Sequence, residues 1–249
     1  MIEIRGLAKR LGRKQVLKDL DLDVRKGETL VVLGPSGTGK SVLLKHIIGL
    51  MQPDAGSIRI DGEEIVGLNE QQLTPVRKRF GMLFQGAALL DSMTVGENVA
   101  LAMQEHARDM DAGEVRGRVA ERLEWVGLQD AVALRPASLS GGMRKRVGLA
   151  RALAMDPEYI LYDEPTTGLD PITADVINVL IRDMQKRLQV TSVVVTHDIK
   201  SAYTVADRIV LLYQGRVMFD GTAEETRRTT DAMMRQFIEG SSRGPIQPV

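Results

Sequence analysis

Short apolar runs alternate with longer amphipathic stretches along the chain. The short runs are rich in β-branched residues and are bounded by turn residues, a pattern that predicts β-strands. They are Thr29–Leu33, Ser57–Ile60, Phe80–Phe84, Tyr159–Tyr162, Ser192–Val195 and Arg208–Leu212. Because longer helical stretches separate these runs, we predict an α/β fold with a largely parallel sheet between helices. The nearly all-apolar strands are expected at the centre of that sheet, covered on both faces.

The strand pattern disappears between about Leu89 and Ala154. Charged and alanine-rich segments with helical spacing replace it, including Glu114–Val126 and Arg144–Ala154. Further on, the residues Thr222-Ala223-Glu224-Glu225 have the spacing of a capping box, which predicts the start of a helix. These patterns indicate a helical subdomain inserted into an α/β core, with a helix near the end of the chain.

The predicted domain organisation follows from these segments. We expect a discontinuous core over residues 1–88 and 155–221. The helical subdomain is expected over residues 89–154, and a C-terminal helix with a tail over residues 222–249.

Composition narrows the classes of protein that fit. The chain has 249 residues, with 33 Lys and Arg against 33 Asp and Glu, so charge alone does not attract it to nucleic acid. It has no cysteine, which excludes a disulfide scaffold, a thiolate zinc site and a cysteine nucleophile. The apolar runs are strand-sized, and Met1–Arg5 carries charge where a secretory signal has an apolar core. We therefore expect a cytosolic protein without a membrane span.

A glycine-rich loop follows the strand Thr29–Leu33. The loop reads Gly34-Pro35-Ser36-Gly37-Thr38-Gly39-Lys40-Ser41 and leads into an apolar helix, which is the strand–loop–helix context of a P-loop. Its backbone N–H groups and the helix N-terminus favour phosphate. Lys40 is expected to reach the β- and γ-phosphates, and the Ser41 hydroxyl to ligate Mg²⁺. The alternative is a glycine-rich turn with an incidental lysine.

Two carboxylates end the strand Tyr159–Tyr162. Mg²⁺ on a phosphate needs only one or two protein oxygens, and Asp163 is placed to supply one. Glu164 is then available to orient and deprotonate the attacking water. The alternative is an acidic turn that caps a helix.

A second glycine turn, Leu139-Ser140-Gly141-Gly142-Met143, precedes a helical segment. It is a second potential anion site, but it has no lysine placed to hold a nucleotide alone. Here the sequence resembles the ABC-transporter ATPases, whose Leu-Ser-Gly-Gly loop closes over ATP bound to a second subunit. The resemblance covers essentially the whole chain. It implies a P-loop NTPase core with an inserted helical subdomain, and ATP with Mg²⁺ as cofactors.

The resemblance assigns roles to three further residues. Gln85 matches the glutamine that contacts Mg²⁺ and couples the site to the membrane partner. Asp170 matches an aspartate across the dimer interface, although Asp before Pro is also an ordinary helix start. His197 matches the histidine that touches the γ-phosphate. The catalytic residues implied are Glu164, His197 and Lys40. Nucleotide is expected to contact the phosphate loop, Gln85, Ser140, Gly141, Gly142 and Asp170, and Mg²⁺ to contact Ser41, Gln85 and Asp163.

The sequence departs from the commonest family pattern at two positions. Met143 stands where many members have glutamine, which leaves the phosphate chemistry intact. Leu11 occupies the position where many members stack an aromatic ring on adenine. Three other cations, Arg144, Lys145 and Arg146, either reinforce the phosphate site or form a solvated helix face. His46 and His106 match no motif and are read as packing or surface residues.

Several stretches outside the motifs look like the ATPases of Mla/Mce-type phospholipid transporters of Gram-negative envelopes. They are residues 82–95, the Gly-Gly-Met signature, residues 170–173, residues 235–240 and Gly244-Pro245. This resemblance implies a head-to-tail dimer of this chain, integral-membrane permease subunits and a lipid-binding Mce-type protein, with no nucleic acid. The chain would then lie peripherally on the cytoplasmic face of the inner membrane. The segment Gly86–Met93, apolar for a loop, is expected to face the permease or to pack inside the subdomain.

Three alternatives remain open at this point. One is the ATPase of an importer for a polar solute, which shares every catalytic motif. Another is a soluble ABC protein acting on ribosomes or nucleic acid, which the single cassette and the neutral charge disfavour. The third is an inactive regulatory subunit, which the presence of Lys40, Asp163, Glu164 and His197 disfavours.

Overall fold

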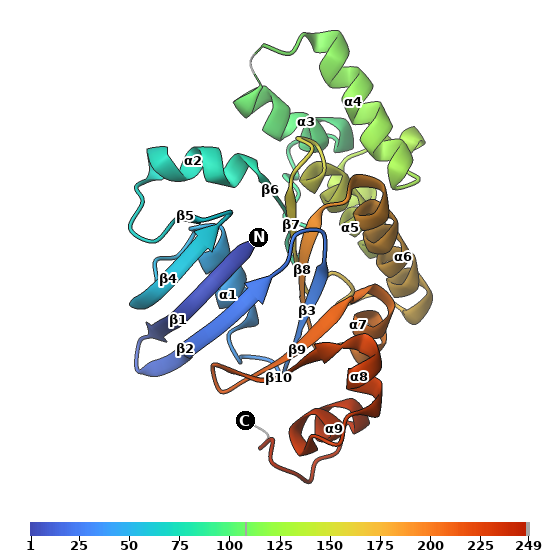
Figure 1. The fold of residues 1–249 in the computed structure, drawn as a ribbon. Helices are drawn as coiled ribbons and strands as arrows, with labels where there is room; N and C mark the ends of the chain where they lie inside the picture. The colour runs from blue at the N-terminus through green and yellow to red at the C-terminus, as the bar shows by residue number, and fades with distance from the viewer. Residues whose placement is uncertain (108, 248–249) are drawn as a thin grey trace. The chain divides into compact units, whose positions relative to one another are not determined.

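The computed structural model describes residues 1–107 and 109–247, and the chain divides into two compact units (Figure 1). The first unit comprises Met1–Thr74 and Thr191–Val249, and the second comprises Pro75–Val190. Sequence analysis predicted three parts, a core, a helical subdomain and a tail, whereas this division has two units. The three predicted boundaries therefore stay predictions.

The first unit contains most of the strands. Its elements are β1 (Ile2–Leu11), β2 (Lys14–Val24), β3 (Thr29–Leu33), α1 (Lys40–Ile47), β4 (Ala55–Ile60), β5 (Glu63–Glu64), β8 (Thr191–Thr196), α7 (Ile199–Val205), β9 (Arg208–Tyr213), β10 (Arg216–Thr222), α8 (Ala223–Arg228) and α9 (Ala232–Glu239). Helix α2 (Glu70–Lys78) leads from the first unit into the second.

Strand β3 carries the phosphate loop and lies between two parallel neighbours. Val31 pairs with Val194 of β8 and with Ile209 of β9, and β10 continues antiparallel to β9. Every residue of β3 and β8 is buried, as the all-apolar runs predicted. The carboxyl ends of these parallel strands therefore share one edge, where the phosphate loop and His197 begin.

A separate antiparallel sheet, in the order β2-β1-β4-β5, occupies the N-terminal part of the first unit (Figure 1). Its apolar side chains, among them Ile2, Ile4 and Leu7, are fully buried, while charged residues of the same strands face outward. Sequence analysis did not predict β1 and β2, because their half-buried alternation is interrupted by register shifts along β1.

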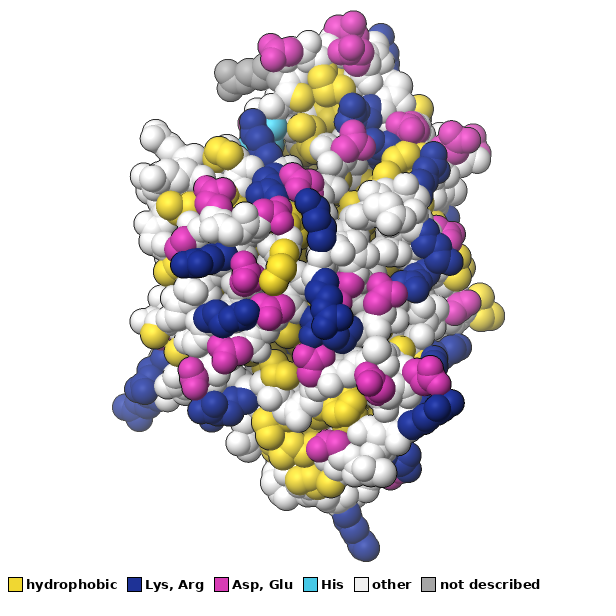
Figure 2. Space-filling view, viewed as in Figure 1, with side chains coloured by type: hydrophobic (Ala, Val, Ile, Leu, Met, Phe, Trp, Pro, Cys, Tyr) yellow, Lys and Arg dark blue, Asp and Glu magenta, His cyan; other side chains and the backbone are white. Residues whose placement is uncertain are grey.

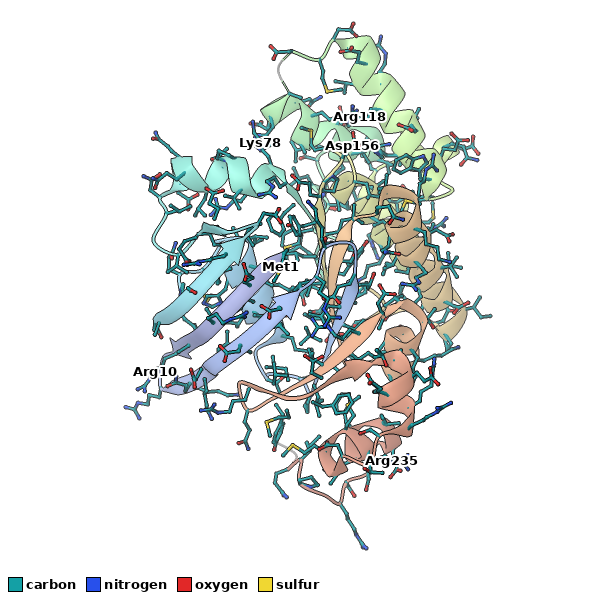
Figure 3. The ribbon with its side chains drawn as sticks, viewed as in Figure 1. Met1, Arg10, Lys78, Arg118, Asp156 and Arg235 are labelled. Atoms are coloured by element: carbon teal, nitrogen blue, oxygen red, sulfur yellow. The ribbon has the colours of Figure 1, made fainter. Side chains whose placement is uncertain are left out.

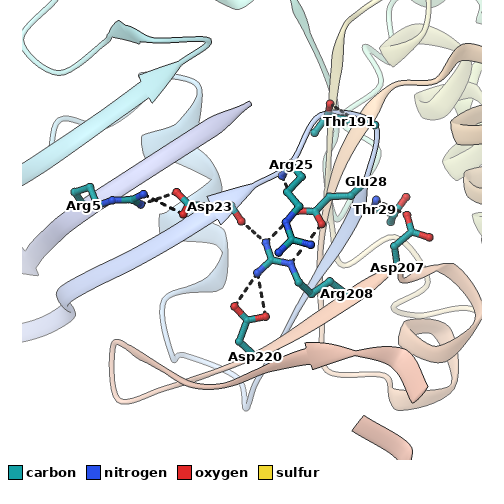
Figure 4. Close-up of polar contacts among 10 residues, drawn as sticks. Arg5, Asp23, Arg25, Glu28, Thr29, Thr191, Asp207, Arg208 and Asp220 are labelled. Carbon is teal, nitrogen blue, oxygen red and sulfur yellow. Dashed lines mark hydrogen bonds and ion pairs between the residues drawn. The ribbon is translucent and has the colours of Figure 1, made fainter. Parts of the chain in front are cut away.

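One arginine joins four segments of the first unit (Figure 4). Arg208, at the start of β9, forms ion pairs with Glu28 at 3.0 Å and Asp220 at 2.7 Å, and also donates to the carbonyl oxygen of Asp23. Nearby, the Asp207 carboxylate accepts from the backbone N–H of Thr29 at 2.8 Å. These contacts fix β9 against the first residues of β3.

The second unit pairs strand β6 (Phe80–Leu83) in parallel with β7 (Tyr159–Asp163). Its helices are α3 (Val95–His106), α4 (Ala112–Trp125), α5 (Gly141–Ala152) and α6 (Pro171–Leu188), with short 3₁₀ turns at Gln129–Ala131 and Pro136–Ser138. The described residues between β6 and β7 contain no strand, as the sequence pattern predicted.

Helix α4 is held by charged side chains at its inner face. Arg118 pairs with Asp156, in the turn before β7 (Figure 3). Arg122 pairs with the same carboxylate. Arg122 also lies over the ring of Trp125 at 3.9 Å, and Arg187 of α6 lies over the same ring at 4.2 Å. The indole is therefore held between two guanidinium groups.

The last described residues fold back onto helix α9. The Gln236 side chain donates to the carbonyl oxygens of Ser241, at 3.1 Å, and Ile246, at 2.9 Å, and accepts from the Ile246 N–H at 2.6 Å. Ile246 is buried, and the N–H of Gln247 donates to the Tyr213 hydroxyl at 3.0 Å. The segment expected to be a plain tail thus has specific attachment points.

Most of the predicted elements are confirmed. All six predicted strands are present, and Thr222 caps α8 with the reciprocal hydrogen bonds of a capping box. Among the described residues, no helix is long and apolar enough to span a membrane. Acidic and basic side chains are interspersed over the face seen in Figure 2, in keeping with the formal charge of zero.

Candidate functional site

The phosphate loop joins β3 to α1 in the first unit, and its glycines are required by close approaches. A Cβ at Gly34 would lie 2.3 Å from the carbonyl oxygen of Leu212, so a side chain does not fit there. Gly39 has φ +107°, a conformation that favours glycine, and directly precedes the first residue of α1. The N–H groups at the start of α1 therefore lie at the loop, as a phosphate site requires.

Lys40 lies inside this loop and is buried. Its ammonium donates to the carbonyl oxygens of Gly34, at 2.7 Å, and Pro35, at 3.1 Å. The Thr38 hydroxyl also donates to the Pro35 carbonyl, at 2.9 Å. The loop thus already surrounds the cation that is expected to meet the nucleotide phosphates.

The turn after β1 reaches the same loop. Leu11 ends β1 with 42% of its surface exposed, and pairs with Lys14 of β2. The Lys14 ammonium donates to the carbonyl oxygen of Gly37 at 3.2 Å. This contact places the Leu11 turn beside the phosphate loop, where a nucleotide base is expected.

His197 follows β8 and faces the same region of the first unit. It is exposed and lines a cavity of about 310 Å³ together with Pro35 and Ser36. The other lining residues come from the end of the chain: Gln236, Phe237, Gly240, Ser241 and Ile246. Sequence analysis found His197 through its motif but gave no sign of the C-terminal wall.

The candidate Mg²⁺ ligand Asp163 ends β7 in the second unit, and the candidate general base Glu164 follows it. Asp163 and Glu164 are each 8% exposed. The Glu164 carboxylate accepts a hydrogen bond from the Thr167 hydroxyl at 3.0 Å, and its backbone has φ +48°, which non-glycine residues rarely adopt. A short turn after β7 therefore fixes both the backbone and the carboxylate of Glu164.

The signature loop opens α5, also in the second unit. The Ser140 hydroxyl accepts from the N–H of Met143 at 3.2 Å, so it caps the helix. Ser140 and Gly141 are exposed, whereas Gly142 is buried against Thr173. An exposed helix N-terminus of this kind is suited to phosphate presented by another molecule.

The position of Lys145 excludes one alternative for this residue, the solvated helix face. It is 5% exposed, so it does not belong to a solvated helix face. Its ammonium donates to the carbonyl oxygens of Gln85, at 2.5 Å, and Glu164, at 3.0 Å. Burial lowers the pKa of Lys145, while the Asp163 and Glu164 carboxylates act in the opposite direction. No motif signalled this contact, because the partners are backbone atoms far along the chain.

Asp170 begins helix α6. Its carboxylate accepts from the N–H groups of Ile172 and Thr173, both at 3.0 Å. Hydrogen bonds from the side chain of Thr173, the larger effect, and from its backbone N–H lower the pKa of Asp170. The helix-start alternative is therefore confirmed, and a role in contact with a second subunit stays a prediction.

The predicted Mg²⁺ ligands have the oxygen chemistry that this ion prefers: a hydroxyl, an amide and a carboxylate. Ser41 belongs to the first unit, and Gln85 and Asp163 belong to the second. Within the described residues, no group of three His, Asp or Glu side chains is arranged to hold a metal. The joint role of Ser41, Gln85 and Asp163 as ligands stays a prediction.

Comparison with known proteins places the chain in a family. The family model described as ABC transporter matches residues 17–167, which include the phosphate loop, the signature loop and the β7 carboxylates. The chain belongs to the ABC transporter ATPases. The activity of this family is ATP hydrolysis coupled to transport, so the chain is an ATP-binding enzyme.

Two kinds of relatives match nearly the whole of this ABC ATPase. The intermembrane phospholipid transport system ATP-binding protein MlaF of Haemophilus influenzae is 41% identical over 99% of this chain and 93% of its own length. MlaF of Escherichia coli K12 is 39% identical over 99% and 91%. A probable ribonucleotide transport ATP-binding protein, mkl of Mycobacterium leprae, is 42% identical over 98% of this chain and 70% of its own length.

Solved structures confirm the predicted ABC ATPase fold. The dimeric ATP-binding cassette MJ0796, in a post-hydrolysis state with ADP and Pi, has a TM-score of 0.83 and 35% identity, covering 90% of this chain and 99% of that one. The cbiO1 protein of Clostridium perfringens, part of the cbiONQ transporter complex, has a TM-score of 0.84 and 28% identity, covering 95% and 94%.

A prediction for this ABC ATPase concerns base recognition at Leu11. Leucine offers a smaller contact to a purine than an aromatic ring, whose stacking contributes about 1–3 kcal/mol. We expect GTP to compete with ATP within about an order of magnitude, and Leu11→Tyr to tighten ATP binding up to roughly tenfold. Competition binding with a fluorescent nucleotide measures both. Strong preference for ATP in the wild type, with no gain in Leu11→Tyr, would mean that other residues read the base.

Proposed function

We propose that this ABC ATPase powers a transporter that moves phospholipid between the membranes of a Gram-negative envelope. The observation that carries the proposal is the correspondence with MlaF, which extends over 99% of this chain and 93% of the Haemophilus protein at 41% identity. Resemblance outside the catalytic motifs, including residues 82–95, points the same way.

In the proposed reaction, the phosphate loop binds the triphosphate of ATP. Lys40 exchanges its bonds to the Gly34 and Pro35 carbonyls for phosphate oxygens, and the N–H groups at the start of α1 supply further donors. Ser41, Gln85 and Asp163 would hold Mg²⁺, which would supply positive charge to the phosphates. Glu164 orients and deprotonates the attacking water, and His197 contacts the γ-phosphate.

The proposed assembly contains two copies of the chain, head to tail. Ser140, Gly141 and Gly142 of one copy would close over ATP held by the phosphate loop of the other, and Asp170 would lie at the interface. The exposed, lysine-free helix N-terminus at Ser140 supports this arrangement, as does the dimeric state of the MJ0796 cassette.

The shared site predicts a large effect of a substitution at Ser140. In Ser140→Arg, a long side chain replaces the exposed cap, so ATPase activity of the assembled dimer should fall at least about tenfold. The phosphate loop is untouched, and ATP should still bind the single chain with an affinity within about threefold of wild type. Steady-state hydrolysis and nucleotide titration measure the two quantities. Wild-type hydrolysis in Ser140→Arg would remove the signature loop from the site.

A membrane partner is proposed to bind beside the loop that follows β6. Ala88 and Leu90 line a cavity of about 490 Å³ in the second unit, together with Phe80, Phe84 and Arg151. Leu90 is 43% exposed, whereas Ala87 is buried against Gly148. The predicted permease contact is therefore assigned to Ala88 and Leu90 rather than to Ala87. Binding there would hold the chain at the cytoplasmic face of the inner membrane, with an Mce-type lipid-binding protein in the same complex.

The name of mkl supports ribonucleotide transport as a second candidate, and an importer of another polar solute shares the same catalytic residues. The deciding experiment purifies the full chain with its membrane partners and reconstitutes the complex in vesicles. ATP-dependent movement of a fluorescent phospholipid, absent from a complex carrying Glu164→Gln, is the expected result. Movement of a labelled ribonucleotide without phospholipid movement would favour the second candidate and overturn the first.

A further inference from the structure

Helix α5 holds the segment that follows β6 at three positions on one face. Lys145, Gly148 and Arg151 are spaced three residues apart, so the three positions lie on the same side of the helix. Lys145 donates to the carbonyl oxygen of Gln85, at 2.5 Å. The Arg151 guanidinium donates to the carbonyls of Ala87 and Ala88, both at 2.6 Å.

The middle position leaves no space between helix and loop. A Cβ added to Gly148 would lie 2.7 Å from the Leu83 side chain and 3.2 Å from that of Ala87. Ala87 and Ala88 have φ of +59° and +49°, a conformation that non-glycine residues rarely adopt. The guanidinium of Arg151 therefore stabilises an uncommon backbone turn directly after Gln85.

Lys145 makes a second contact that the other two positions lack. Its ammonium also donates to the carbonyl oxygen of Glu164, at 3.0 Å. The same carbonyl accepts from the Thr167 N–H at 3.3 Å, and Glu164 itself has φ +48°. The peptide that follows the candidate general base is thus fixed by hydrogen bonds from two directions.

The N-terminus of α5 carries the signature loop. Ser140 caps the helix five residues before Lys145, and Gly142 packs against Thr173. One helix in the second unit therefore bears the residues proposed to meet the other ATP, and its single lysine, Lys145, contacts both Gln85 and Glu164. A buried ammonium is a costly way to fill space, since an apolar side chain of similar size avoids desolvation. The two acceptors of the Lys145 ammonium, the carbonyls of Gln85 and Glu164, indicate that it links these two backbone segments.

We propose that Lys145 is a positioning residue that ties the backbone of Glu164 to the backbone of Gln85. By fixing the Glu164 backbone carbonyl, the ammonium indirectly keeps the Glu164 carboxylate in its catalytic geometry while the Gln85 loop is docked on α5. Displacement of that loop removes the Gln85 carbonyl from the ammonium. The position of Lys145, and with it that of the Glu164 backbone, then depends on whether the loop is docked. The inference deepens the proposed function, because it rests on Glu164 acting as the general base.

The test compares full-length Lys145→Met with the wild type in steady-state ATP hydrolysis and nucleotide titration. Methionine keeps the length and removes the N–H donors. We expect kcat to fall by about 10²-fold, the loss that a small misplacement of a catalytic group produces. The KM for ATP and the affinity for a fluorescent ATP analogue should stay within about threefold, because the phosphate loop is unchanged.

Arg146→Met is the matched control. Arg146 also lies on α5 and donates to backbone carbonyls, those of Val126 and Gly127 at 3.1 and 3.3 Å, but it contacts neither Gln85 nor Glu164. We expect its kcat to stay within about twofold of wild type at matched folded fraction. Equal losses of kcat in both variants would overturn the proposal, since the effect would then be general loss of structure. If Lys145→Met does not fold, Lys145→Gln, which keeps N–H donors and lacks the charge, is measured in the same way.

A double variant separates this inference from the role of Glu164. If Lys145 acts through Glu164, adding Lys145→Met to Glu164→Gln should lower single-turnover hydrolysis by less than about threefold. A further 10²-fold loss would overturn the positioning role. Wild-type turnover in Glu164→Gln alone would instead contradict the proposed function. Wild-type turnover in Lys145→Met, with Glu164→Gln inactive, would overturn only this inference.

Discussion

Glu164→Gln is expected to lower ATP turnover by about 10²–10⁴-fold while leaving ATP binding intact. Glutamine keeps the size of the side chain and a carbonyl oxygen for the Thr167 hydroxyl, which the Glu164 carboxylate accepts at 3.0 Å. It does not accept a proton from water. The variant should therefore accumulate as an ATP-bound dimer, measured by size-exclusion chromatography with and without ATP.

The control for this variant is Glu158→Gln. Glu158 pairs with Arg79 at 2.9 Å in the same unit and is half exposed, so its loss should change turnover by less than about twofold. Two results would remove Glu164 from the proposed role: unchanged turnover in Glu164→Gln, or loss of ATP binding in that variant.

Of the substitutions considered, Arg208→Met is expected to lower the free energy of unfolding most. Arg208 and Glu28 have side chains 12% and 10% exposed, and removal of the arginine leaves the Arg25 N–H as the remaining hydrogen-bond donor to the Glu28 carboxylate among the described residues. Breaking such a pair costs about 3–5 kcal/mol. At about 2–4 °C per kcal/mol for a chain of this size, the thermal midpoint should fall by roughly 6–20 °C.

The matched control is Arg216→Met on the neighbouring strand. Its guanidinium lies 3.9 Å from Asp19, and both side chains are more than half exposed, so its loss should change stability by less than about 1 kcal/mol. Scanning calorimetry of the two variants gives the comparison. A midpoint for Arg208→Met that equals that of the control would mean that the contacts in Figure 4 do not stabilise the sheet.

The features that sequence analysis predicted depend on neighbours in the chain. The loop from Gly34 to Ser41 is recognisable because its glycines and lysine must stand at fixed spacing between a strand and a helix. The same holds for the capping box at Thr222 and for the apolar run of β3. In each case the residues that determine the structure lie within about eight positions of one another.

The features that sequence analysis missed depend on distant partners. Lys145 contacts backbone atoms 60 and 19 residues away, and a backbone acceptor leaves no residue type to recognise. Arg208 reaches Glu28 across 180 residues. Strands β1 and β2 escaped prediction for a different reason, because bulges along β1 break the two-residue alternation that marks a strand.

The Gln236 side chain bonds Ile246 in the way that a residue of a neighbouring β-strand would. A side-chain amide presents a carbonyl and an N–H in the same plane, as a peptide group does, and here it meets both backbone groups of Ile246 at 2.6 and 2.9 Å. One side chain thereby attaches a backbone segment ten residues further along the chain, which a β-ladder achieves with many peptide groups. A substitution at Gln236 alone would consequently remove three of the segment's hydrogen bonds without any alteration of the segment itself, while the Gln247 N–H keeps its bond to the Tyr213 hydroxyl.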